Sequence, residues 1–363
     1  MAVEQQAILS VLQGVLDPNT GQDFVSSKAL KNLQVSGADV SFDVELGYPA
    51  KSQLAGIRKL LIAAVKAVAG VGNVSVNVSF KVASHSVQRG VQLLPNVKNI
   101  VAVASGKGGV GKSTTAVNLA LALSAEGASV GLLDADIYGP SQPMMMGIEG
   151  RPESVDGKNM EPMENYGIQV MSIGFLVAQD EAMIWRGPMA TQALEQLLRQ
   201  TNWRDLDYLI VDMPPGTGDI QLTLSQRVPM TGAVIVTTPQ DIALLDAKKG
   251  IKMFEKVGVP ILGIVENMAV HICSNCGHTE HIFGEDGGKK MAADYKMDYL
   301  GALPLDMQIR LQADNGRPTV VADPDGDVAG IYKAIARKMA ITVAAKAKDF
   351  SAKFPTIKIS KDT

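Results

Sequence analysis

The chain has 363 residues, of which 46% are hydrophobic and 20% are charged, and its formal net charge is −3. This usage is typical of a globular protein and excludes a disordered, collagen-like or membrane-spanning chain, while the length favours a smaller domain beside a larger one. The slightly acidic balance argues against nucleic acid as the main partner, because no overall field attracts phosphate groups.

Neither a membrane span nor an export signal is predicted. The longest apolar runs, such as 100–104 and 232–236, are far shorter than the roughly 20 residues that cross a bilayer. The start of the chain lacks the basic residues and the long apolar block of a signal peptide. Only two cysteines are present, which excludes a disulfide scaffold and favours metal or redox use in a reducing compartment. We therefore expect a cytoplasmic protein without a membrane partner.

The N-terminal part is predicted to be a small α+β domain over residues 1–85, followed by a linker over 86–98. Apolar periodicity predicts four elements there: a helix over 3–16, a strand over 40–46, a helix over 51–69 and a strand over 74–82. The first helix ends at the turn Asp17-Pro18-Asn19-Thr20-Gly21.

From residue 99 to residue 348 short apolar strands alternate with helices, which predicts an α/β domain with a mainly parallel sheet flanked by helices. The expected strands lie over 100–104, 129–133, 168–172, 208–211, 233–237, 261–265 and 299–302. Residues 349–363, rich in lysine, are expected to form a tail.

A glycine-rich loop follows the first of these strands and precedes a helix predicted over 114–126. It reads GKGGVGKS from Gly106 to Ser113 and matches the P-loop pattern G-x-x-x-x-G-K-[ST]. Its backbone N–H groups surround phosphates, Lys112 reaches the β- and γ-phosphates of ATP, and Ser113 ligates magnesium. The predicted nucleotide-binding residues are Gly106, Lys107, Gly108, Gly109, Val110, Gly111, Lys112, Ser113 and Thr114.

A second lysine, Lys107, lies inside the loop and exceeds what the pattern requires. It resembles the signature lysine of the deviant Walker A family, which includes the ParA and MinD partition ATPases and the nitrogenase iron protein. In that family this lysine reaches the partner's nucleotide, so the resemblance implies a homodimer with ATP between its subunits and a catalytic role for Lys107 beside Lys112. A solvated loop lysine is the alternative.

Acids stand at the ends of two predicted strands, where a parallel sheet presents its carboxyl edge to a ligand. The resemblance implies that Asp136 positions or activates the attacking water, that Asp134 and Asp212 support magnesium, and that residues 214–219 form switch II. It also implies that Asn267 reads the adenine ring. Helix caps and surface acids are the ordinary alternatives for such positions.

The cysteine pair, Cys273 and Cys276, lies in a polar loop. Two thiols supply half of the four ligands of a zinc or iron-sulfur site, and a symmetric dimer supplies the rest, giving one exposed [4Fe-4S] cluster bridged between subunits. A zinc site completed within one chain by His278 and His281 is an alternative. A thioredoxin-like redox pair, which Gly277 disfavours, and inert buried thiols are the others.

Six segments in order resemble the Mrp/ApbC iron-sulfur cluster carriers over about residues 95 to 345. They are the P-loop, DADIYGPS from Asp134, WRGP from Trp185, DMPPGTGD from Asp212, ENM from Glu266 and the cysteine pair. The N-terminal unit resembles the small MIP18-type domain, but it lacks the cysteine that many such domains carry near Tyr48-Pro49, so it receives no cluster ligand. The resemblance implies a homodimer that takes a labile cluster from a scaffold, delivers it to apoproteins and hydrolyses ATP slowly, with switch II coupling the two sites.

Two other functions use the same loop. In a MinD/ParA-like positioning switch, the helix predicted over 328–348 would lie in a membrane interface with its lysines against Ile331, Ile335 and Met339, although a helix that covers the sheet is favoured. In an electron carrier like the nitrogenase iron protein, the cluster would be stable and redox-active.

Overall fold

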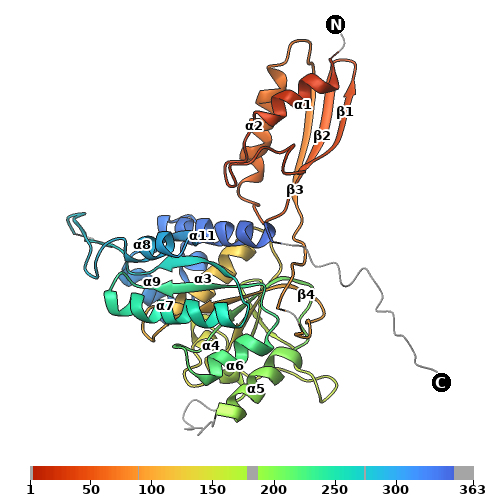
Figure 1. Ribbon diagram of the computed structural model, residues 1–363. Coiled ribbons are helices and arrows are strands. Elements are labelled where there is room, and N and C mark those ends of the chain that lie inside the picture. Colours follow the sequence, from red (N-terminus) through yellow and green to blue (C-terminus); the bar gives the residue numbers. More distant parts are fainter. Residues whose placement is uncertain (1–2, 89, 178–186, 274, 347–363) are drawn as a thin grey trace, which may run out of the picture.

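The structure is a computed structural model that describes residues 3–88, 90–177, 187–273 and 275–346. Figure 1 shows a small N-terminal domain standing on a larger one. The predicted tail and the Trp185-Arg186 part of one motif lie outside the described residues. Among the helices within those ranges, none combines the length and the apolar character needed to span a bilayer.

The small domain packs two helices on one face of a sheet, which in the described residues has three strands in the order β1-β2-β3. The elements are α1 (Gln5–Gln13), β1 (Leu30–Ser36), β2 (Asp39–Leu46), α2 (Leu54–Lys66) and β3 (Val74–Phe80). Leu12 of α1 and Leu61 of α2 are fully buried. The two helices and two strands expected here are confirmed.

The sequence prediction missed β1, which pairs with β2 in the antiparallel sense. Its register shifts between Lys31 and Gln34, and Asn32 between them has a left-handed φ of 49°. This irregularity breaks the period-two alternation from which a strand is predicted. The order of elements is therefore helix, two strands, helix and strand.

The large domain is built on a sheet whose strand order in the described residues is β13-β10-β9-β4-β8-β5-β7-β6. The strands are β4 (Val97–Ala104), β5 (Val130–Asp134), β6 (Met163–Asn165), β7 (Ile168–Ser172), β8 (Leu206–Asp212), β9 (Gly232–Thr237), β10 (Ile261–Glu266) and β13 (Tyr299–Ala302). Neighbouring strands are parallel except β6, which pairs with β7 in the antiparallel sense. All the strands expected in this domain are present, and β6, with three residues, was too short to show a pattern.

Helices cover both faces of this sheet (Figure 1), as predicted for a parallel α/β sheet. They are α3 (Lys112–Ala125), α4 (Gln142–Met145), α5 (Gly187–Arg199), α6 (Asp219–Arg227), α7 (Asp241–Lys256), α8 (Gly287–Asp294), α9 (Met307–Asp314), α10 (Thr319–Ala322) and α11 (Asp327–Ala344), with a 3-10 turn at Ile173–Phe175. A two-stranded hairpin, β11 (His271–Ile272) and β12 (Thr279–Glu280), completes the domain. The hairpin was not predicted.

The C-terminal helix α11 lies against α3 and the β13 edge of the sheet. Ile335 and Met339, which would have faced a membrane interface, are buried in this contact, and only Ile331 of the three is partly exposed. The prediction that this helix covers the sheet is confirmed.

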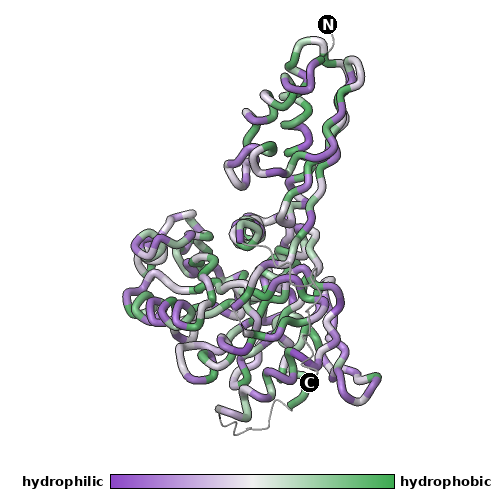
Figure 2. Tube along the Cα trace, turned by 45° about the vertical axis from the view of Figure 1, so that its right-hand side comes forward, coloured by the Kyte–Doolittle hydropathy of each residue, from purple (hydrophilic) through white to green (hydrophobic). Residues whose placement is uncertain are grey.

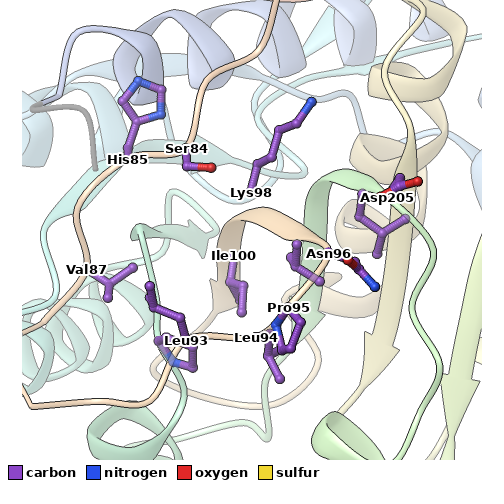
Figure 3. A pocket seen from close by; sticks show the side chains of 13 residues that line it. Ser84, His85, Val87, Leu93, Leu94, Pro95, Asn96, Lys98, Ile100 and Asp205 are labelled. Atoms are coloured by element: carbon purple, nitrogen blue, oxygen red, sulfur yellow. The ribbon is translucent and has the colours of Figure 1, made fainter. Parts of the chain in front are cut away.

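The segment predicted as a linker is docked on the large domain, and β4 begins within its last residues. Gln88 donates its side-chain amide to the carbonyl of Ser225 at 2.8 Å, and the ring of buried His85 meets Asn99 Oδ1 at 3.0 Å. A cavity of about 440 Å³ lies between this segment and the amino ends of β4 and β8 (Figure 3). Apolar side chains such as Leu93 and Leu94 line much of it. It is at the edge of the sheet opposite the P-loop.

The burial of the strands differs between the two domains, whose hydropathy Figure 2 displays along the chain. In the large domain the central strand β9 is buried along its whole length. In the small domain β2 alternates between exposed and buried positions, because only one face of that sheet is covered by helices. The larger core therefore holds the carboxyl edge, where the polar site lies, as a rigid frame.

Candidate functional site

The P-loop connects the carboxyl end of β4 to the start of α3. Gly111 at the helix start has a left-handed φ of 82°, which a side chain rarely adopts. Gly108 and Gly109 are exposed, and a Cβ atom at either would meet no atom within 4 Å. A glycine-rich loop that opens a helix can direct its backbone N–H groups at an anion such as a phosphate.

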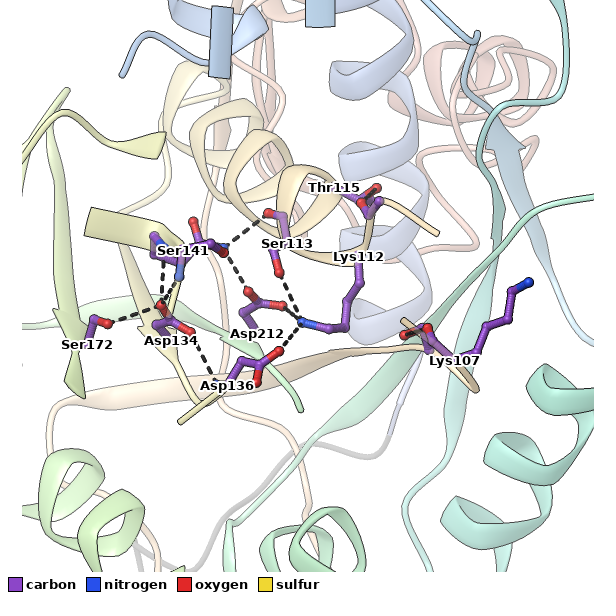
Figure 4. Close-up of polar contacts among 12 residues, drawn as sticks. Lys107, Lys112, Ser113, Thr115, Asp134, Asp136, Ser141, Ser172 and Asp212 are labelled. Carbon is purple, nitrogen blue, oxygen red and sulfur yellow. Dashed lines mark hydrogen bonds and ion pairs between the residues drawn. The ribbon is translucent and has the colours of Figure 1, made fainter. Parts of the chain in front are cut away.

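Lys112, the first residue of α3, is at the centre of a buried polar cluster (Figure 4). Its Nζ atom donates to the carboxylate of Asp212 at the end of β8 and to Ser113 Oγ at 3.1 Å, and lies 4.0 Å from Asp136 Oδ2. Burial raises the pKa of the Asp136 carboxyl, and nearby Lys112 opposes this effect. The structure thus brings four predicted residues together.

Asp134 lies beside this cluster but directs its oxygens at the following loop. It accepts hydrogen bonds from the backbone N–H groups of Ser141 at 3.0 Å and Gln142 at 3.1 Å, and from Ser172 Oγ at 3.0 Å. Burial, followed by repulsion from Asp212, raises its pKa to about 7. In this arrangement Asp134 fixes the loop that leads into α4, and its predicted part in the magnesium shell stays a prediction.

Gln142 is a site residue that the sequence analysis did not find. Its side-chain amide donates to Asp212 Oδ2 at 2.8 Å and to the carbonyl of Ser113 at 3.1 Å. It follows the DADIYGPS segment directly, but a glutamine at a helix start carries no signal of its own. Only the loop held by Asp134 brings it to the cluster.

The residues present fit magnesium and a nucleotide. Ser113 Oγ and the carboxylates of Asp136 and Asp212 form an all-oxygen donor set, which magnesium prefers. In the described part of the chain, buried Ser141 Oγ and Gln142 Oε1 have no hydrogen-bond partner, so further polar capacity faces the site. These residues would hold the ion and the phosphates.

Lys107 is not part of the cluster. Its half-buried side chain points away from Lys112 and Asp212 (Figure 4). The hydroxyl of Ser105 donates to its carbonyl at 2.8 Å, which fixes the backbone of the loop. Its predicted action on a partner's nucleotide stays a prediction.

Asn267 contacts the P-loop directly. Its side-chain amide donates to the carbonyl of Val110 at 2.8 Å, and a Cβ atom at Gly111 would fall 2.2 Å from its Nδ2 atom. Glycine is therefore required at 111 both for its φ angle and for this close approach. The predicted contact of Asn267 with adenine stays a prediction.

The cysteines lie on the β11–β12 hairpin. The N–H of Cys273 donates to the carbonyl of His278 at 2.9 Å, and the N–H of Gly277 donates to the carbonyl of Cys273 at 2.8 Å. Cys276 is exposed and Cys273 is partly exposed. The backbone N–H groups of Cys276 and Asn275 lower the pKa of the Cys273 thiol. The pair thus lies on a tight turn whose backbone N–H groups lower the pKa of one thiol.

The structure can be compared with each of the three alternative roles for this cysteine pair. The interpretation as inert buried thiols is wrong, because Cys276 is exposed. His281 directs its Nδ1 atom at the carbonyl of Ala269, 2.9 Å away, and within the described ranges no three metal-ligating side chains are grouped, so a zinc site of one chain finds no support. A thioredoxin-like pair opens a helix, whereas this pair lies between two short strands.

Comparisons with known proteins cover both domains of the chain. Residues 96–340 match the family model described as NUBPL iron-transfer P-loop NTPase. The chain belongs to this family. Its N-terminal residues 5–78 match a second model, described as iron-sulfur cluster assembly protein, as the resemblance had implied.

Relatives of the family cover most of the chain. The protein named iron-sulfur cluster carrier protein from Escherichia coli K12 is 51% identical over 346 residues, which are 93% of each chain. The mouse protein named iron-sulfur cluster transfer protein NUBPL is 55% identical over 248 residues, 68% of this chain and 78% of the mouse one.

Solved structures support the fold of the family domain. A nucleotide-binding protein from Archaeoglobus fulgidus in complex with ADP is 39% identical, with a TM-score of 0.56 over 64% of this chain and 90% of that one. The cell division ATPase MinD from Pyrococcus furiosus is 21% identical, with a TM-score of 0.51 over 66% of this chain and 98% of that one. The MinD likeness shows the shared P-loop NTPase fold.

Proposed function

We propose that this chain is an iron-sulfur cluster carrier that binds and slowly hydrolyses ATP and holds a [4Fe-4S] cluster, its cargo, at a homodimer interface. One observation carries the proposal: a Cys-x-x-Cys pair, with Cys276 exposed and Cys273 partly exposed, lies on a hairpin that leaves the sheet just after a residue that contacts the P-loop. The names of the relatives agree with it.

The nucleotide half of the function follows from the polar cluster. Lys112 and the P-loop N–H groups would hold the phosphates, while Ser113 and Asp212 would hold magnesium, which neutralises charge on the phosphates when bound. Asp136, with its raised pKa, would orient the attacking water and accept its proton. Lys107, which points out of its own site, would act in the partner's site.

The proposal that the chain carries a cluster rests on the number of thiol ligands in one chain and on their exposure. A four-iron cluster takes four thiolates, and one chain offers two adjacent ones, so two chains related by a twofold axis complete the set. Exposed ligands suit a cluster that must leave for an apoprotein after arriving from a scaffold. The MinD-like switch gives no use to this pair, and the apolar side of α11 is buried.

Anaerobic reconstitution with iron and sulfide tests the proposal. We expect a sulfur-to-iron charge-transfer band, about four irons per dimer, and loss of both in Cys273→Ala and Cys276→Ala. Transfer of the cluster to an apoprotein should follow, whereas an electron carrier would keep its cluster and cycle reversibly. A colourless wild-type protein that binds zinc or no metal would overturn it. The cytoplasmic location stays a prediction.

A further inference from the structure

The segment that contains the cysteine hairpin is held at its two ends by contacts of two neighbouring residues, Glu266 and Asn267. Glu266 is the last residue of β10 and Asn267 follows it. Both side chains are buried, with exposures of 1% and 8%. The chain leaves the sheet after Asn267, forms the cysteine hairpin, and returns to contact Glu266 at the start of α8.

Asn267 ties the departing end to the nucleotide loop. Besides its side-chain bond to the carbonyl of Val110, its backbone N–H donates to the carbonyl of Thr237 at 2.7 Å. Met268 then has a left-handed φ of 56°, which turns the chain sharply toward the hairpin. Six positions separate Asn267 from Cys273.

Glu266 ties the returning end. Its carboxylate accepts a hydrogen bond from the N–H of Gly288 in the first turn of α8, and a Cβ atom at Gly288 would lie 2.7 Å from its Oε2 atom. A carboxylate at a helix N-terminus is favoured by the partial positive charge there. Glycine at 288 lets α8 approach this closely.

The base of the hairpin between these ties is braced. His281 Nδ1 meets the carbonyl of Ala269 at 2.9 Å, and the N–H of Leu305 donates to the carbonyl of Val270 at 2.8 Å. The first contact joins the two ends of the hairpin segment, and the second joins this segment to the residues that follow β13.

We propose that Asn267 and Glu266 are positioning residues that couple the nucleotide loop to the cysteine pair, so that the nucleotide state sets the exposure and spacing of the two thiols. The inference rests on the proposed function and names its route of regulation. When the carbonyl of Val110 reorients with the phosphates, Asn267 follows it, because a buried carbonyl left without its donor is costly. Glu266 keeps the other end of the hairpin fixed, so the tip changes its conformation.

Thiol alkylation in the reduced, cluster-free full chain tests this coupling. The rates at Cys273 and Cys276 are measured by mass spectrometry with no nucleotide, with Mg-ADP and with a magnesium-bound nonhydrolysable ATP analogue. In the wild type we expect the ATP analogue to change the rates at least about five-fold, the lower range of allosteric coupling. Nucleotide concentrations are set above each variant's own measured Kd.

Substitutions of Asn267 and Glu266 should reduce the ratio of the alkylation rates measured with and without the ATP analogue. Asn267→Ala removes the donor to Val110, and Asn267→Asp keeps the size but offers only acceptors; both should bring the ratio below about two-fold. Glu266→Ala removes the acceptor of the Gly288 N–H, touches no P-loop residue in the described contacts, and should lower the ratio with nucleotide affinity unchanged. Glu280→Ala is the matched control, because it truncates an exposed glutamate of the same hairpin and should keep the wild-type ratio.

The outcomes of these experiments test the coupling separately from the proposed function. The coupling would be overturned if the alkylation rates of the wild type did not depend on nucleotide. It would also be overturned if the variants of Asn267 and Glu266 kept the wild-type ratio of rates. If Asn267→Ala binds no nucleotide, the ratio in Glu266→Ala decides alone. The assay needs no cluster, so failure of reconstitution would sink the proposed function without touching this result, and the reverse also holds.

Discussion

Glu126, the residue that ends the P-loop helix α3, shares one carboxylate between Ser52 of the small domain and Arg337 of α11. Its Oε1 atom accepts from Ser52 Oγ at 2.7 Å and from the Arg337 guanidinium, and its Oε2 atom accepts from the N–H of Ser52 at 3.0 Å. Its backbone carbonyl accepts from the N–H of Lys51 at 3.0 Å. The small domain is therefore attached to the far end of the helix that begins at the nucleotide site.

Removal of this carboxylate should destabilise the protein and release the small domain. Glu126 is 1% exposed and Arg337 16%, so Glu126→Ala leaves a largely buried guanidinium unpaired, at a cost of about 3 kcal/mol in the free energy of unfolding. Ser52→Ala, which removes one neutral donor, should cost about 1 kcal/mol. Urea unfolding measures both, and limited proteolysis between the domains should be faster in Glu126→Ala. Equal losses in the two variants would contradict this role.

The two lysines of the P-loop should behave differently when substituted. Lys112 belongs to the site of its own chain, so Lys112→Ala should lower nucleotide affinity about 100-fold. Lys107 points away, so Lys107→Ala should bind a fluorescent ATP analogue within about three-fold of the wild type yet lose ATP-dependent dimerisation in analytical ultracentrifugation. A Lys107→Ala chain that dimerises normally with ATP would remove the action in trans.

The parallel sheet and the polar cluster were predictable because their signals are local. The buried strand β8 contains a continuous apolar run over residues 208–211, and the parallel topology places its last residue, Asp212, at the carboxyl edge of the sheet. The P-loop pattern gives the position of Lys112 in the same way. The fold of the large domain and the polar cluster thus follow from segments of ten residues or fewer.

Other polar contacts could not be predicted, because they depend on residues far apart in the chain. Gln142 reaches Asp212 only because Asp134 holds the intervening loop, and Glu126 meets Ser52 across a domain boundary. A glutamine or a glutamate in the sequence does not by itself indicate such a partner. The strand β1 was hidden for a local reason, the left-handed Asn32, which no apolar pattern reveals.

The raised pKa of Asp134 predicts a pH-dependent stability. Its folded-state value of about 7 lies above the ordinary 3.8, so the folded chain holds a proton that the unfolded chain releases between those values. The stabilisation is full below about pH 4 and is lost as the pH rises through 7, with a slope of at most about 1.4 kcal/mol per unit. Urea unfolding at several pH values should show wild type losing stability relative to Asp134→Asn over this window. Parallel curves would contradict the assignment.

The lowered pKa of Cys273 predicts that this thiol reacts at a pH where an ordinary cysteine is still protonated. In Cys276→Ser, where Cys273 is the single thiol, the alkylation rate should reach half its maximum below the value of about 8.5 typical of a free cysteine. The reason is the pair of backbone N–H groups of Asn275 and Cys276, which persist in that variant and favour the thiolate. The same variant unfolded in urea is the control, because the turn that aims these groups is then lost. Identical midpoints in the folded and unfolded states would show that the turn does not prepare the thiol for metal.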